Sequence, residues 1–250
     1  MDERIEALAG ALREADTAAA FTGAGISAAS GVPTFRGADG IWETQFDPAD
    51  FEYDRFRSDP AGFWSDRLEL REALRVGEVE PNPAHEALAE LEAAGHLDGV
   101  ITQNTDGLHQ RAGSDRVVEL HGSGSRVVCV DCDRRVDAAG VVERVRDGER
   151  PPECEACGGL LKPDVTLFGE RLDRLALNEA RSLAESSDVF LAAGSSLTVQ
   201  PAAGLPVRAA RDGTLAIVNL EATPHDDAAA YVFHEDVTEV LPRVAATVLE

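Results

Sequence analysis

A glycine-rich run, GAGISAASGVPTFRG over residues 23–37, follows a short apolar stretch that predicts a buried strand entering a turn. Gly23 and Gly25 lack a Cβ atom, so their backbone can approach a phosphate closely, and Ser27 adds a hydroxyl donor. The residues after this turn can open a helix whose N–H groups face an anion. A strand–turn–helix without a ligand is the alternative. The run ends on an aromatic side chain and a cation that suit a mobile flap over a bound ligand, Phe35 and Arg36.

Apolar strand candidates alternate with helical patterns along most of the chain. The strand candidates are continuously apolar, which is typical of buried parallel strands, and they cover residues 18–22, 98–103, 117–120, 188–193 and 214–219. Apolar periodicity favours helices at about 2–14, 84–95, 173–186, 201–212 and 237–248. This alternation predicts an α/β fold with a doubly wound parallel sheet. Two stretches break the alternation and are expected to be insertions, residues 38–80 and 123–161.

All four cysteines lie in the second insertion, as two C-x2-C pairs separated by 21 residues: Cys129, Cys132, Cys154 and Cys157. Such pairs can complete a tetrahedron of thiolates, so the spacing predicts one structural Zn²⁺ ion. Disulfides and a redox C-x-x-C motif are the alternatives. A reducing compartment disfavours the first, and the repetition of the motif disfavours the second. Four protein ligands leave no open position, so the metal is expected to stabilise and not to catalyse.

The chain is strongly acidic, with 46 acidic against 23 basic residues and a net charge of −23. The carboxylates are spread along the sequence, which favours a surface adapted to molar salt, where the Debye length is ~3 Å. A surface that recruits basic partners is the alternative. The lack of a basic patch argues against sequence-independent nucleic-acid binding. No apolar run reaches the ~20 residues of a membrane span, and no signal-peptide pattern opens the chain, so a cytoplasmic location is expected.

Polar residues follow several strand candidates, at the edge where open α/β sheets bind ligands. Gln103–Asp106 could hold a carboxamide and a ribose, and His121 is a candidate general base because a histidine pKa lies near neutrality. Gly194–Ser196 could cradle a phosphate, and Asn219–Glu221 could take ribose hydroxyls. Each motif alone also fits a simple turn. Because five strand ends carry such motifs, we expect one ligand site at this edge.

The remaining histidines lack such a setting and are expected at the surface or in helix caps: His85, His96, His109, His225 and His234. The segment 162–169 is predicted to be extended, and its backbone could bind a peptide substrate as an added strand. Lys162 is the only lysine of the chain, and a stabilising surface ion is the other interpretation of this residue.

The chain resembles the sirtuin family over nearly its whole length. The motifs that carry the resemblance occur in the sirtuin order: GAGISAASGVPTFRG, QNTDGLH, LHG, the paired C-x2-C, KPDVTLFGE, GSSLTVQPA and VNLE. The resemblance implies an NAD-dependent protein-lysine deacetylase or deacylase with a Rossmann-like NAD-binding domain, residues 1–35, 81–122 and 162–250. It also implies a smaller domain made of a helical module, residues 36–80, and a zinc module, residues 123–161.

The same resemblance implies roles for individual residues. His121 is implied as the catalytic base and Asn104 as a second catalytic residue. NAD contacts are implied for Gly23, Ala24, Gly25, Ser27, Thr34, Phe35, Arg36, Gln103, Asn104, Thr105, Asp106, Gly194, Ser195, Ser196, Asn219, Leu220, Glu221 and Val237. The residues implied to flank the acyl-lysine peptide are Val165, Leu167, Phe168, Gly169 and Glu170.

The implied reaction consumes NAD and moves no hydride. The acyl oxygen attacks the nicotinamide ribose, nicotinamide leaves, and His121 deprotonates a ribose hydroxyl, which yields free lysine and O-acyl-ADP-ribose. Two departures from the family pattern matter. Thr34 stands where many sirtuins have Asp. The Tyr-x-x-Arg pair of desuccinylating sirtuins is not intact, because the alignment places Arg67 and Leu70 there. Acetyl or neutral longer acyl groups are therefore expected, although Arg67 or Arg71 could meet an acidic acyl group in another geometry.

Other functions remain open from the sequence. Protein mono-ADP-ribosyl transfer would use the same NAD cleavage and would label protein. A dehydrogenase is disfavoured because the glycine pattern continues into 33–36 and no clear ribose-binding acid follows ~20 residues on, apart from Glu43. A zinc-ribbon binding module without catalysis leaves His121 unexplained. Acyl-lysine proteins or peptides are the implied partners, and a monomer is expected.

Overall fold

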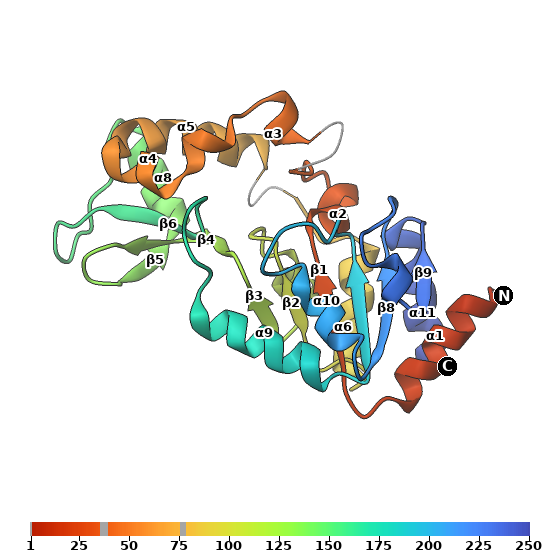
Figure 1. Cartoon of the computed structure of the whole chain (residues 1–250). Helices are drawn as coiled ribbons and strands as arrows, with labels where there is room; N and C mark the ends of the chain where they lie inside the picture. Colours follow the sequence, from red (N-terminus) through yellow and green to blue (C-terminus); the bar gives the residue numbers. More distant parts are fainter. Residues whose placement is uncertain (1, 36–39, 76–78) are drawn as a thin grey trace.

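Six parallel strands form the larger of two sheets in the computed structural model, which describes residues 2–35, 40–75 and 79–250 (Figure 1). The strand order is β3-β2-β1-β7-β8-β9. The strands are β1 Ala18–Thr22, β2 Val100–Thr102, β3 Val117–Glu119, β7 Val189–Ala193, β8 Thr214–Val218 and β9 Tyr231–Phe233. The order of the strands turns back at β1, which pairs with β2 on one side and β7 on the other. This is the topological switch point, where doubly wound sheets bind ligands.

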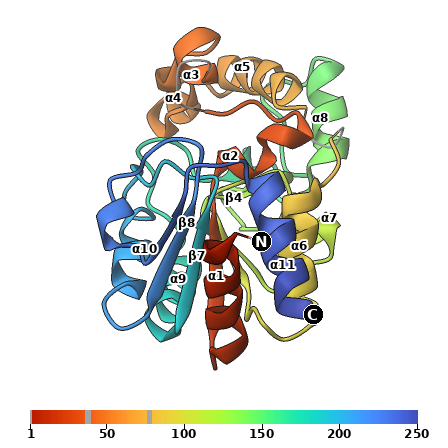
Figure 2. The ribbon, with the colours of Figure 1, turned by 90° about the vertical axis from the view of Figure 1, so that its right-hand side faces the viewer.

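Helices cover both faces of the larger sheet. One face packs against α1 (Glu3–Glu14), α6 (Pro83–Ala93) and α11 (Val237–Leu249), whose apolar residues share a core with the strands. The other face packs against α9 (Arg174–Ser186) and α10 (Gly204–Ala209). Figure 2 shows α6 and α11 on one side and α9 and α10 on the other. Burial on both faces explains why β1 and β7 are continuously apolar in sequence.

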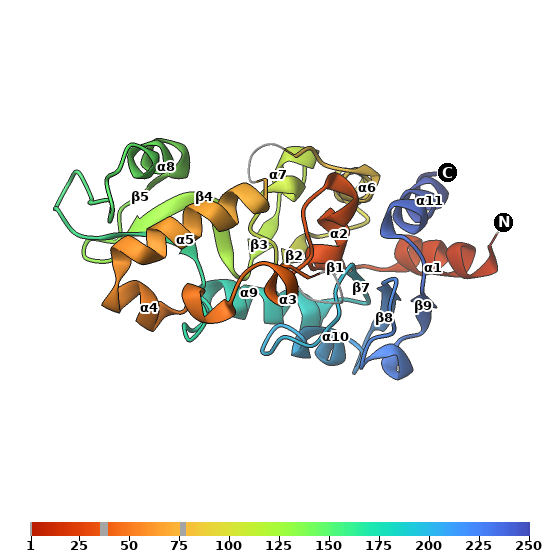
Figure 3. The same ribbon diagram turned by 90° about the horizontal axis from the view of Figure 1, so that it is seen from above.

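The smaller sheet is antiparallel and has the order β5-β4-β6. Its strands are β4 Gly122–Cys129, β5 Arg135–Asp137 and β6 Leu161–Val165. The helix α8 (Ala138–Arg146) and aromatic residues of α4 (Tyr53–Ser58) and α5 (Pro60–Ala73) share an apolar core with this sheet. Trp64 of α5 donates a hydrogen bond to the carbonyl of Leu161 at 2.9 Å. In the view from above, α5 crosses over the smaller sheet (Figure 3), and Arg71 of α5 donates to the carbonyl of Gly124 in β4 at 2.6 Å. The remaining helices are α2 Ala24–Ser27, α3 Ile41–Thr44 and α7 Leu108–Ala112, with 3-10 turns at Ala28–Ser30, Pro48–Phe51 and Asp226–Ala228.

The predicted α/β fold with a doubly wound parallel sheet is confirmed, and each strand candidate contains one strand of the larger sheet. The sequence did not predict β9, which is three residues long and lies at the edge of the sheet. The predicted extended segment at 162–169 begins as β6, which pairs with β4 of the smaller sheet. Within the described ranges, no helix has both the length and the apolar character needed to cross a membrane.

Candidate active site and metal centre

The strands of the larger sheet end in one row. Thr22 of β1 pairs with Thr102 on one side and Ala193 on the other, and the row continues to Glu119 and Val218. Each of these residues is the last of its strand. The motifs that follow the strands therefore gather at a single edge of the sheet, as the sequence predicted.

Two of these turns, after β1 and β7, meet at the switch point. The N–H of Gly25 donates to the carbonyl of Gly194 at 2.8 Å. A Cβ atom on Gly25 would lie 2.8 Å from that oxygen, and one on Gly23 would lie 2.9 Å from Cβ of Ser195. Gly194 itself has φ +62°, which favours glycine. The sequence predicted that glycine makes room for a phosphate. In the structure the same residues first make room for the neighbouring turn.

Ser27 is the centre of a buried polar cluster beside these turns. Its hydroxyl donates to Asp106 Oδ2 at 2.7 Å and accepts from Asn104 Nδ2 at 3.1 Å. His85 Nε2 lies 3.3 Å from the same oxygen. Since His85 Nδ1 accepts the backbone N–H of Asn82, the ring proton sits on Nε2 and points at Ser27. The cluster therefore fixes the orientation of both Asn104 and Asp106.

Two histidines of this region are buried, and one of them, His109, contradicts the sequence prediction of a surface or capping position. His85 caps α6, which confirms the capping prediction, but it is also fully buried, and desolvation lowers its pKa to about 4. His109 is also buried, 2.9 Å from Thr22 Oγ1, and desolvation lowers its pKa to about 3, with His85 nearby adding to the shift. The two rings are 4.9 Å apart. A signal for His85 existed in the sequence, because it lies one turn before Leu88 on the apolar face of a helix.

His121 follows β3 at the same edge of the sheet. Its Nδ1–H donates to the carbonyl of Gln103 at 2.9 Å, so the neutral ring keeps its lone pair on Nε2. Within the described ranges, no residue forms a hydrogen bond with Nε2 of His121. Desolvation lowers the pKa of His121, although the hydrogen bond to Gln103 opposes this shift. The ring is therefore neutral near pH 7 and can accept a proton at Nε2.

Several other predicted residues join this edge. Gln103 Nε2 donates to Ser195 Oγ at 2.9 Å, which links the turns after β2 and β7. The carbonyl of Thr105 accepts the N–H of Gly124 at 2.8 Å. Other predicted contacts have no hydrogen bond to the Ser27 cluster within the described ranges: Ser196, Asn219, Leu220, Glu221 and Val237. Leu220 is 68% exposed.

The predicted flap and the predicted peptide segment meet through aromatic rings. Phe35 stacks on Trp42 with ring centres 5.5 Å apart, and Trp42 meets Phe168 edge-on at 5.7 Å. Phe168 also forms a bridge with Glu52, so the segment after β6 is already paired on one side. Thr34 accepts a hydrogen bond at its carbonyl from Ile41. Arg36 lies outside the described residues.

Lys162 and Glu170 form an ion pair inside the loop of the predicted peptide segment. Lys162 is 8% exposed, which contradicts the interpretation as a surface ion. Its Nζ donates to the carbonyl of Val165 at 2.7 Å and to Glu170 Oε2 at 2.9 Å. The same carboxylate oxygen accepts the N–H of Leu167 at 2.7 Å. This ion pair closes the loop that holds Val165, Leu167, Phe168 and Gly169.

The four cysteines form one cluster in the smaller sheet and its adjoining loop, with their Sγ atoms all within 4.8 Å of one another. Sγ of Cys129 lies 3.5 Å from that of Cys157, and Sγ of Cys132 lies 3.9 Å from that of Cys154. These distances are too long for disulfides. Zinc–sulfur bonds of ~2.3 Å place the corners of a tetrahedron ~3.8 Å apart. The thiols therefore fit a structural zinc ion, as the sequence predicted.

The comparisons with known proteins agree with this site. The Sir2 family model matches residues 23–201. A curated relative from Haloarcula marismortui, named NAD-dependent protein deacetylase, is 60% identical over 97% of this chain and 94% of its own length. A relative from Archaeoglobus fulgidus, named NAD-dependent protein deacylase 2, is 45% identical over 99% of this chain and 97% of its own length. The chain belongs to the Sir2 family, and the predicted sirtuin resemblance is confirmed.

Solved structures of Sir2 enzymes match the whole fold. One, described as a structural basis for Sir2 mechanism and regulation, is 44% identical, has a TM-score of 0.88, and covers 100% of this chain and 99% of its own. Another is a Sir2 histidine variant with deacetylated p53 peptide and 3′-O-acetyl ADP ribose, 39% identical with a TM-score of 0.88 over 96% of each chain. A Sir2 complex with p53 peptide and NAD⁺ is 38% identical, with a TM-score of 0.86 over 96% of each chain.

Proposed function

We propose that this protein is an NAD-dependent protein-lysine deacylase that produces deacylated lysine, nicotinamide and O-acyl-ADP-ribose. Relatives named as deacetylases and deacylases cover nearly the full chain, and one related complex holds deacetylated peptide with acetylated ADP-ribose. The single observation that carries the proposal is the neutral His121 ring, held by the Gln103 carbonyl with Nε2 open at the sheet edge. A general base at this position typically contributes ~10²–10⁴ in rate.

NAD is the proposed cosubstrate, and it supplies an electrophilic ribose carbon with nicotinamide as the leaving group. The donor set fits it: small turns at the switch point, then hydroxyl, amide and carboxylate groups in one buried cluster. We assign phosphate contacts to the two glycine turns, and the nicotinamide–ribose region to Gln103, Asn104 and Asp106. The adenosine half is assigned to the residues after β8 and to Val237 at the start of α11. His121 Nε2 then takes a proton from a hydroxyl brought to it.

We propose that the acyl-lysine peptide binds along the segment after β6. Support comes from Phe168, which remains 36% exposed while its backbone is paired with Glu52 on one side. The Trp42–Phe168 contact places the flap beside this segment. An acetyl or neutral longer acyl group is proposed because Leu70, at one position of the missing Tyr-x-x-Arg pair, is buried in the apolar core.

A structural zinc ion is proposed at the four thiols. With all four ligand positions taken by Cys, the metal would have no site for substrate, so its role is to hold β4 to the loop that carries Cys154 and Cys157. Metal binding by thiolates also supports a reducing, cytoplasmic location. The net charge of −23 supports adaptation to molar salt, which the relative from Haloarcula marismortui at 60% identity makes worth testing in this chain.

The proposed organisation has a Rossmann-like domain, residues 1–35, 81–122 and 162–250, and a smaller domain of a helical module (36–80) and a zinc module (123–161). The pairing of β6 with β4 attaches the first residues of the last segment to the smaller sheet. A monomer stays a prediction, which light scattering after size exclusion would test.

The test is a mass-spectrometric assay at ~2 M KCl with NAD and matched acetyl- and succinyl-lysine peptides. Free-lysine peptide with equal amounts of nicotinamide and O-acetyl-ADP-ribose supports the proposal, and the ratio of the two peptides gives the acyl preference. Nicotinamide release with intact peptides and ADP-ribose on protein would favour the transferase. No consumption of NAD by a folded, zinc-loaded protein would overturn the catalytic assignment.

A further inference from the structure

The ladder between β4 and β6 is interrupted directly after the His121 turn. It pairs Gly122 with Val165, resumes only at Val127, and so leaves residues 123–126 of β4 opposite Asp164 alone. Bulged segments of this kind lose ladder hydrogen bonds, and they are common next to active sites. Backbone pairing therefore does not fix the distance between these two strands at the interruption.

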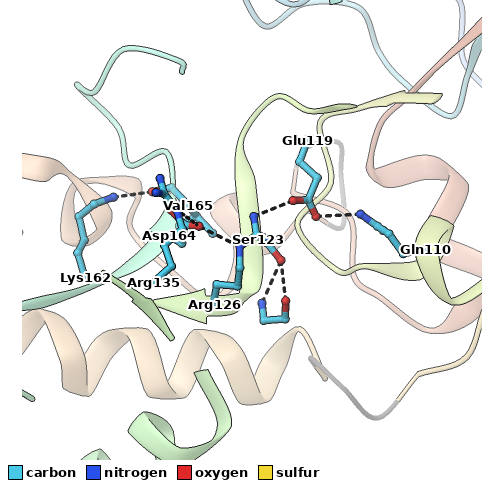
Figure 4. Close-up of polar contacts among 9 residues, drawn as sticks. Gln110, Glu119, Ser123, Arg126, Arg135, Lys162, Asp164 and Val165 are labelled. Atoms are coloured by element: carbon cyan, nitrogen blue, oxygen red, sulfur yellow. Dashed lines mark hydrogen bonds and ion pairs between the residues drawn. The ribbon is translucent and has the colours of Figure 1, made fainter. Parts of the chain in front are cut away.

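Side chains bridge the gap instead (Figure 4). Arg126 Nη2 donates to Glu119 Oε2 at 2.8 Å, and its Nε donates to Asp164 Oδ2 at 3.0 Å. Glu119 ends β3 of the larger sheet and Asp164 lies in β6 of the smaller one, so one guanidinium connects the two sheets. The two carboxylate side chains are only 15% and 13% exposed, which limits their screening by salt.

His121 lies between the two ends of this bridge. It is two residues after Glu119, and its carbonyl accepts the N–H of Thr166, which is two residues after Asp164. A Cβ atom on the following Gly122 would lie 2.1 Å from the carbonyl oxygen of Asp164. The His121 turn and the start of the proposed peptide segment are therefore in direct backbone contact, and a shift of one strand moves both.

We propose that Arg126 is a positioning residue that fixes the His121 turn against the peptide-binding segment 164–168. The inference rests on the proposed function, because that function makes these two elements the walls of the peptide site. Arg126 is the counterion that Glu119 and Asp164 share. Without its guanidinium, the two carboxylates would face each other from opposite sheets. Glu119 would then be a poorly solvated carboxylate without its Arg126 partner, and its repulsion from Asp164, which keeps Arg135, would separate the strand ends.

The chain offers a matched control. Arg135 Nε donates to the same Asp164 oxygen at 3.1 Å, but Arg135 does not bind Glu119, and its side chain is 58% exposed. Arg126→Met keeps the aliphatic stem and removes the charge. We expect this variant to raise the peptide KM and lower kcat, with kcat/KM about tenfold lower, while Arg135→Met stays within about twofold of the wild type.

Two further variants separate positioning from a general loss of structure. Arg126→Lys should recover part of kcat/KM, because a cation returns without the two-pronged geometry. Adding Glu119→Gln to Arg126→Met should also recover activity, because it removes the repulsion between the carboxylates. A double variant no better than Arg126→Met would contradict that repulsion as the cause.

Amide hydrogen exchange gives a readout that does not depend on catalysis. In Arg126→Met, exchange should quicken within 121–126 and 164–168 and stay unchanged in α1 and α11; in Arg135→Met neither region should change. Activity loss without this local change, a uniform increase over the chain, or identical behaviour of the two variants would each overturn the proposal. If the wild type shows no deacylation, the proposed function fails, and the exchange comparison still decides the role of Arg126.

Discussion

The substitution Gly25→Ala tests why the glycine-rich run is needed. A Cβ atom on this residue would lie 2.8 Å from the carbonyl oxygen of Gly194 and 2.9 Å from its Cα, and backbone atoms cannot rotate away. Gly25 lies in α2, so alanine meets no obstacle from its own backbone conformation. Gly25→Ala should therefore force the turns after β1 and β7 apart at the switch point.

The expected cost follows from the close contact. Overpacking by one methyl group costs about 1–3 kcal/mol. In a chain of 250 residues, each kcal/mol shifts Tm by about 2–4 °C, so the variant should lose about 2–12 °C. Gly10→Ala is the control, because nothing lies within 4 Å of its added Cβ and it sits inside α1. Alanine there should stabilise by about 1 kcal/mol and raise Tm by a few degrees.

Thermal unfolding by circular dichroism at ~2 M KCl, with NAD binding by calorimetry, measures both effects. The reasoning predicts that Gly25→Ala loses stability even without NAD. A variant with wild-type Tm and weakened NAD binding would refute it. In that case the glycine would serve the approach of the ligand, as the sequence alone suggested, and the contact with Gly194 would be relaxed at no cost.

Four other predictions concern the base, the buried histidines and the metal. His121→Ala should abolish turnover in the mass-spectrometric assay and leave folding and zinc content intact; loss of zinc would refute that assignment. Activity should fall on acidification through the His121 pKa, which burial holds below its usual 6.5, because only the neutral ring accepts a proton. Stability should fall from about pH 6.5 towards pH 4, because His85 and His109 stay neutral when folded but protonate when unfolded. Each of these two histidines contributes on the order of 3 kcal/mol to the free energy of unfolding. Equal urea midpoints at pH 7 and pH 5 would contradict this prediction. A zinc chelator should lower Tm, and an unchanged melting curve would refute a structural metal.

The sequence predicted those parts of the site that local patterns encode. The C-x2-C spacing lets Cys129 and Cys132, and likewise Cys154 and Cys157, supply two ligands to one ion, and all four thiols do gather in one cluster. His121 was found because it follows a strand, and parallel strands align their ends at one edge. Both predictions need only the order of elements along the chain.

Other parts depend on contacts between distant segments. Ser27, His85 and Asp106 meet in one cluster although 58 and 79 residues separate the pairs, and no local pattern predicts that packing. The burial of His109 depends on Thr22 in the same way, since the two are 87 residues apart. The reason for Gly25 was also inaccessible, because it depends on how closely the turn after β7 approaches. Sequence patterns located these residues but not their neighbours.

Lys162 connects the composition of the chain with its proposed reaction. All other basic residues counted in the sequence are arginine, and this single lysine is buried between the Val165 carbonyl and Glu170. An ammonium is a compact charge with three donors, whereas a planar guanidinium would need more room between these two acceptors. Lysine is thus kept where the loop after β6 must close tightly. Because this ε-amine is paired and Lys162 as a whole is 8% exposed, its acylation would require that loop to open. The folded protein therefore presents no exposed lysine side chain to its own site, and free lysine detected in the deacylation assay must come from the added peptide.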